Sequence, residues 1–234
     1  MRPPYSEYAA PPIYVYPAPP KRGVHFSRTE LTQLGIAILG LSAALTVLYV
    51  VWGNGLRILG SPLTSVGFVF ASSLVSVGSG VGLHEIMHKV VAQRYGHWAE
   101  FRYSLQGLAM AFIFAFLGFI FGAPGATYIS GAVTKEQNGR ISAAGPVTNV
   151  VLGLAFIGLY AVVLPIQGMA AALAGAVFQS AAFMNLVLAG FNMIPVMPLD
   201  GAKVWRWNLG AWIGILAVVI GIFVLGMNAN LLFL

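Results

Sequence analysis

The 234-residue chain contains no cysteine, and Asp, Glu, Lys and Arg together make up only 8% of it. The lack of cysteine excludes disulfide frameworks, thiolate metal sites and a cysteine nucleophile, so any metal must be held by His, Asp or Glu. The lack of charge argues against a soluble domain, in which about a quarter of the residues are charged. With 59% apolar residues and a mean hydropathy of +0.85, the composition indicates a polytopic membrane protein.

The basic residues indicate how the chain is oriented in the membrane. The formal net charge is +6, but the twelve Lys and Arg residues are scattered between apolar blocks, which argues against nucleic acid as a partner. Seven prolines and four tyrosines in the first twenty positions predict that residues 1–30 form a disordered tail and not a signal peptide. By the positive-inside rule this tail is cytoplasmic, and residues 31–234 form an integral domain of the cell membrane.

Long stretches without Asp, Glu, Lys or Arg predict the membrane spans, since a span needs about twenty apolar residues. One of these stretches, 141–199, is long enough to cross twice and has a turn signal at residues 165–168. The predicted spans are therefore 33–52, 62–95, 143–164, 170–194 and 209–232.

The stretch 107–121 is too short for an ordinary span and leaves two possibilities open. It either crosses the membrane fully or dips in and returns. Re-entry is favoured because Lys89, Arg94 and Lys135 then all lie on the cytoplasmic side, and the ends of the second and fourth predicted spans share one face. The predicted fold class is an all-α polytopic membrane protein of five to six transmembrane helices, with a re-entrant or β element between the second and third.

Three ionisable residues, His84, Glu85 and His88, lie at the inner end of the second predicted span. Residues four apart lie on one helical face, so His84 and His88 can present two imidazoles to one metal ion. Glu85, about 100° round the helix, can reach a water on that ion without ligating it. This spacing is typical of zincins, in which Glu takes a proton from water. In a soluble helix such residues often face solvent, but a charge-free span offers nothing else to offset their desolvation.

Two histidines leave the site one protein ligand short, because catalytic zinc usually has three. Most other candidates lie outside apolar spans or beside basic residues (His25, His97, Glu7, Glu30, Glu100 and Glu136). Asp200 instead follows a long uncharged run and two helix-breaking prolines, Pro195 and Pro198. Asp200 is either the polar end of a span or the third ligand, and the incomplete histidine pair favours the ligand.

These residues and their order resemble the site-2 protease family of intramembrane zinc metalloproteases over residues 62–205. The motifs that carry the resemblance are His84-Glu85-x-x-His88-x-x-x-Ala92-x-x-x-Gly96, Gly145-Pro146-x-x-Asn149 and Asn192-x-x-Pro195-x-x-x-Leu199-Asp200-Gly201. The resemblance implies one catalytic Zn²⁺ held by His84, His88 and Asp200, with Glu85 as general base, near the cytoplasmic face. The chain departs from many members of that family in lacking a PDZ or CBS domain.

Two asparagines of these motifs have alternative interpretations. A carboxamide can donate a hydrogen bond to a developing oxyanion or to an extended substrate backbone, and the resemblance implies such a catalytic role for Asn192. The alternative is an interhelical or capping hydrogen bond, which is favoured for Asn149. Likewise the small residues at 72–82 either allow close helix packing or line a polar path that brings water to the metal.

The predicted function is hydrolysis of peptide bonds in or near transmembrane segments of substrate proteins, and the resemblance implies membrane-tethered regulators among them. A strand around 100–106 or 126–133 is predicted to hold the unwound substrate. The alternative is a membrane metal-ion transporter or channel that uses the same cluster, but no convincing internal repeat supports it. A non-enzymatic scaffold is disfavoured because all four residues of the cluster are intact.

Overall fold

The computed structural model describes residues 23–53, 55 and 58–232, so most of the predicted N-terminal tail lies outside the described residues. Five helical segments in this part of the chain are long and apolar enough to cross a membrane. They are α1 (Arg28–Val51), the continuous run of α2 (Pro62–Val77), η2 (Gly78–Leu83) and α3 (His84–Arg94), α5 (Lys135–Val163), α6 (Met169–Asn192) and α8 (Leu209–Asn228). The protein is a mostly helical multi-pass membrane protein, as its composition predicts.

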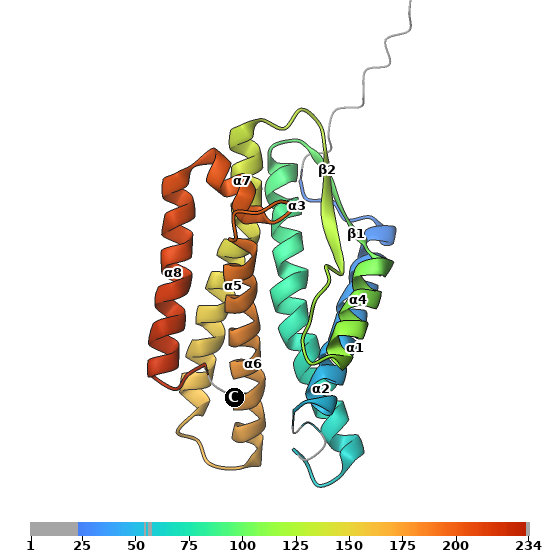
Figure 1. Cartoon of the computed structure of the whole chain (residues 1–234), viewed down its shortest axis with the longest axis vertical. Coiled ribbons are helices and arrows are strands. Elements are labelled where there is room, and N and C mark those ends of the chain that lie inside the picture. The colour runs from blue at the N-terminus through green and yellow to red at the C-terminus, as the bar shows by residue number, and fades with distance from the viewer. Residues whose placement is uncertain (1–22, 54, 56–57, 233–234) are drawn as a thin grey trace, which may run out of the picture.

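The helices lie roughly along the long axis of the molecule, with α8 at one edge and α1 at the other (Figure 1). On one side, Leu41 and Leu45 of α1 pack with Val77 of α2 and Leu108 of the short helix α4 (Leu105–Phe116). On the other side α5 and α6 form a hairpin whose turn falls at 164–168, as the sequence predicts. The α3 segment lies between these two groups and packs against α5.

Local sequence explains where the helices begin. Ser27 and Ser61 accept a hydrogen bond from the backbone N–H three residues later at the start of α1 and α2. Thr134 and Gln137 form a reciprocal capping box at the start of α5. Gly168, with φ at +112°, allows the sharp entry into α6.

A π-helical turn, η2, joins α2 to α3 immediately before His84. Such turns are rare and occur frequently at functional sites. Its residues Ser79 and Gly80 accept hydrogen bonds from Asn185 of α6 and Asn149 of α5, at 3.0 Å and 3.1 Å. The small residues before His84 therefore serve close packing against both neighbouring helices, which is one of the two roles the sequence suggests.

The segment between α3 and α5 begins and ends in two strands that pair with each other. Strands β1 (Trp98–Tyr103) and β2 (Gly125–Ser130) pair antiparallel, so that Trp98 lies opposite Ser130. The helix between them, α4, has only 12 residues. It is therefore about 18 Å long, which is too short for a hydrocarbon core of about 30 Å. The structure thus contains the small β element that the sequence suggests, and re-entry of this segment into the membrane stays a prediction.

One buried ion pair ties α1 to α3 and to the sheet. Glu30 and Lys89 pair through Oε2 and Nζ, and the two residues are each only 1% exposed. The second oxygen of Glu30 accepts the Phe101 N–H of β1 at 3.0 Å. Sequence reasoning treated Glu30 as an acid in a polar segment and Lys89 as an orientation signal. It missed the pair because the two positions are far apart in the chain.

Candidate metal centre

Three predicted site residues from two distant parts of the chain converge at the start of α3. Asp200 Oδ2 lies 3.2 Å from His84 Nε2 and 3.0 Å from His88 Nε2. All three residues are buried, with exposed fractions between 5% and 7%. The two imidazole rings lie edge to face with their centroids 4.6 Å apart. The helical spacing and the position of Asp200 thus produce the cluster that the sequence predicts.

Close packing at the end of α6 brings Asp200 to the histidines. The chain leaves α6 after Asn192, turns through residues 193–199 and starts α7 (Asp200–Trp207) at Asp200 itself. A Cβ atom at Gly201 would overlap the backbone of Met193, so only glycine lets α7 begin this close to α6. The indole of Trp212 in α8 donates to the Met193 carbonyl at 2.8 Å and holds the same turn.

Hydrogen bonds to the far side of each imidazole fix the atom that faces Asp200. His88 Nδ1 lies 2.7 Å from the Ile141 carbonyl, and His84 Nδ1 lies 3.3 Å from Asn149 Oδ1. Asn149 Nδ2 donates to the Gly80 carbonyl, so its oxygen is the atom that accepts from His84. Because both acceptors require a proton on Nδ1, each imidazole in its neutral form presents the Nε2 lone pair toward Asp200.

This donor set fits a divalent cation. When both imidazoles are neutral, their Nε2 atoms and the carboxylate oxygen are all hydrogen-bond acceptors, and a divalent cation among them would satisfy all three. Burial raises the pKa of Asp200, but the adjacent His88 and His84 together lower it by more, so the pKa lies below its usual range. Two His and one carboxylate are a ligand set that zinc uses in catalytic sites.

Helix α5 passes directly over the two imidazoles. A Cβ atom at Gly145 would lie 2.5 Å from His84 Nε2 and 2.6 Å from His88 Nε2, so only glycine fits there. One helical turn further, Asn149 is fully buried and accepts from His84. The motif around Gly145 and Asn149 therefore makes room for the imidazoles and orients one of them. Sequence reasoning gave Asn149 a structural hydrogen bond but did not identify His84 as its partner.

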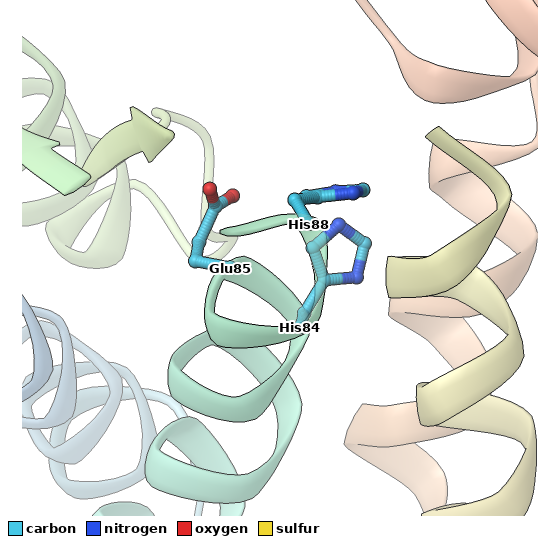
Figure 2. Close-up of side chains that lie close together, drawn as sticks. All are labelled: His84, Glu85 and His88. Atoms are coloured by element: carbon cyan, nitrogen blue, oxygen red, sulfur yellow. The ribbon is translucent and has the colours of Figure 1, made fainter. Parts of the chain in front are cut away.

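Glu85 points away from the two imidazoles, toward the sheet (Figure 2). Its Oε2 accepts the backbone N–H of Thr127 in β2 at 2.8 Å, and its carbonyl accepts the Thr127 hydroxyl at 3.0 Å. The side chain remains close to the centre, since ligand atoms of His84, Glu85 and His88 lie within 4.8 Å of one another. Glu85 is thus beside the imidazole pair without being inserted between its members.

Asn192 and Lys203 make different contacts: Asn192 bonds within its own helix, and Lys203 lies beside Asp200. Asn192 Nδ2 donates to the Leu188 carbonyl within α6 at 3.0 Å, so the structure gives Asn192 a helical hydrogen bond, and its catalytic role stays a prediction. Lys203 Nζ lies 3.6 Å from Asp200 Oδ1, the carboxylate oxygen that faces away from the histidines. Sequence reasoning missed Lys203, although its position three residues after Asp200 in a helix was a usable signal.

Comparison with known proteins identifies the class of enzyme. The chain is 37% identical over 213 residues to "Putative zinc metalloprotease MJ0611" of Methanocaldococcus jannaschii, a match that covers 89% of this chain and 97% of that protein. It is 25% identical over 152 residues to "Zinc metalloprotease MJ0392" of the same organism, covering 64% of this chain and 38% of that protein. No family model and no solved structure matches it. The chain belongs to this family of zinc metalloproteases and is a zinc-dependent hydrolase of peptide bonds.

Proposed function

We propose that the protein is an intramembrane endopeptidase of the site-2 protease type, with Zn²⁺ held by His84, His88 and Asp200. The observation that carries the proposal is the approach of Asp200 Oδ2 to within 3.0 Å and 3.2 Å of the two Nε2 atoms. Both histidines belong to a 33-residue helical run that is long and apolar enough to cross a membrane. A water-soluble metalloprotease does not need an apolar helix of membrane-spanning length to position its zinc ligands.

The position of the cluster along that run supports a site near one membrane face. The 22 residues from Pro62 to Leu83 precede His84 and include no Asp, Glu, Lys or Arg. At 1.5 Å per residue they extend about 33 Å, which is close to the thickness of the hydrocarbon core. With Pro62 at one interface, His84 lies at the other. The positive-inside rule makes this the cytoplasmic interface.

Each residue has a distinct task in the proposed reaction. Zinc, when bound, supplies a Lewis acid that polarises the scissile carbonyl and a water molecule. Glu85 accepts a proton from the attacking water as the new C–O bond forms. It then delivers a proton to the departing amine nitrogen as the C–N bond breaks. Asn192 is proposed to donate a hydrogen bond to the substrate carbonyl oxygen or the adjacent backbone.

The substrate is proposed to be a transmembrane protein, including membrane-tethered regulators. A helical segment hides its carbonyls in internal hydrogen bonds, so it must unwind before attack. Strand addition to β2 would hold it extended. The outer edge of β1 is not available for this, because side chains of Glu30, Gln33 and Gln93 already bond its backbone. Of the two strands that the sequence suggests, β2 is therefore the proposed docking edge.

The decisive experiment is incubation of the detergent-purified protein with a model transmembrane substrate, with and without a zinc chelator. We expect cleavage that the chelator abolishes, and we expect Glu85→Gln to retain zinc but lose turnover. Persistent cleavage by Glu85→Gln, or zinc-containing protein that cleaves no transmembrane substrate, would contradict the proposal. Ion flux into liposomes that does not depend on Glu85 would favour the transporter alternative.

A further inference from the structure

The outward-facing backbone groups of β2 can be assigned from the register of the sheet. Phe101 lies opposite Thr127, and its N–H bonds Glu30 outside the sheet at 3.0 Å. This pair is therefore one of the alternating pairs without hydrogen bonds between the strands. The Thr127 N–H accordingly points out of the sheet, where it donates to Glu85 at 2.8 Å. By the same alternation, the backbone groups of Gly125 and Ile129 also point outward.

The proposed general base thus occupies a backbone donor on the edge where a substrate strand is proposed to pair. An N–H group bonded to the Glu85 carboxylate cannot at the same time donate to a substrate carbonyl in the ladder. Either the substrate strand makes no hydrogen bond to the Thr127 N–H, or the Glu85 carboxylate gives up its hydrogen bond to that group.

We propose that the Thr127 N–H is a switch between Glu85 and the substrate. In the free enzyme it holds the Glu85 carboxylate against β2. When a substrate strand pairs with β2, a substrate carbonyl takes over the Thr127 N–H and Glu85 is released toward the reacting water. Thr127 is thus a positioning residue that also selects the register of the substrate. The proposal rests on the proposed proteolytic function and adds a condition under which the base becomes active.

Replacement of Glu85 by a substrate carbonyl at the Thr127 N–H depends on the length of the paired substrate strand. A charge-assisted hydrogen bond is stronger than the neutral one that replaces it, so release of Glu85 opposes docking at this one position. Pairing at Gly125 and Ile129 supplies further backbone bonds that offset the loss. A substrate long enough to reach from Gly125 to Ile129 therefore activates Glu85, whereas a tripeptide does not.

Proline substitutions separate the two roles of the β2 edge. Thr127→Pro removes the donor that holds Glu85, and Ile129→Pro removes the next outward donor on the same strand but leaves Glu85 held. Neither N–H takes part in pairing with β1, and edge positions of this kind tolerate proline. We expect both variants to raise KM for a model transmembrane substrate. On a fluorogenic tripeptide, we expect Thr127→Pro to turn over about tenfold faster than wild type, the factor expected for one such hydrogen bond. Equal tripeptide rates for Thr127→Pro and wild type at equal zinc content would overturn the proposal.

Amide hydrogen exchange tests the contact without proteolysis and without proline. In full-length Glu85→Ala, the amide of Thr127 should exchange about tenfold faster than in wild type, because its acceptor is gone. The amide of Ile129 serves as the internal control and should exchange equally in both proteins. Equal exchange at Thr127 in both proteins would refute the switch, whatever the enzyme cleaves. Failure of wild type to cleave any substrate, with the exchange difference present, would instead refute the proposed function.

Discussion

The buried ion pair between Glu30 and Lys89 makes a quantitative prediction about stability. Both residues are 1% exposed, so removing one partner leaves a buried charge without compensation, at a cost of about 3–5 kcal/mol. We therefore expect Lys89→Met to lower the free energy of unfolding by that amount. Glu30→Ala should cost about 1–3 kcal/mol more, because it also leaves the Phe101 N–H of β1 without its acceptor.

The matched control is the double variant Glu30→Gln/Lys89→Met. Its new carboxamide oxygen still accepts the Phe101 N–H, and no charge remains in the buried site, so the double variant should lie within about 2 kcal/mol of wild type. The assay is equilibrium unfolding in mixed micelles of SDS and a mild detergent, followed by circular dichroism. Single variants that each cost less than about 1 kcal/mol, with additive effects in the double variant, would refute this account of the pair.

Three further predictions concern the metal centre. Gly145→Ala should abolish zinc binding, because its methyl group would overlap both imidazoles, whereas Gly158→Ala on the same helix meets open space and should retain one zinc per chain by elemental analysis. Asn149→Leu should weaken zinc affinity about 10–100-fold in a competition titration with a chelating dye, since His84 loses the acceptor that orients it; unchanged affinity would show that the hydrogen bond is dispensable. Removing zinc that is present at about a hundred times its Kd should lower the free energy of unfolding by about 3 kcal/mol, and no change in the unfolding midpoint would argue against a site formed only in the folded protein.

Much of the fold could be predicted from charge and hydropathy alone. The desolvation cost of ionisable groups restricts them to the ends of spans and to functional sites, so charge-free stretches gave five spans close to those in the structure. The spacing of His84 and His88 gave two groups on one helical face. The helix-breaking run before Asp200 indicated the segment that meets them.

The parts that the sequence did not reveal depend on contacts between distant segments. Glu30 and Lys89 each stand near other charged residues, and no local pattern pairs them across 59 positions. The π turn before His84 and its bond to Asn149 depend on how α5 packs against the α2 to α3 run. Side chains of α1 and α3 bond the outer edge of β1, which leaves β2 as the proposed docking edge. No pattern in the order of residues indicates these contacts.

X-ray absorption at the zinc edge, compared between wild type and Asp200→Ala, tests the central claim most directly. We expect zinc in wild type to be coordinated by two imidazole nitrogens and by carboxylate or water oxygens at about 2.0–2.2 Å. We expect Asp200→Ala to lose its bound zinc. Full zinc occupancy with an identical spectrum in Asp200→Ala, or a wild-type spectrum without imidazole scattering, would contradict that claim.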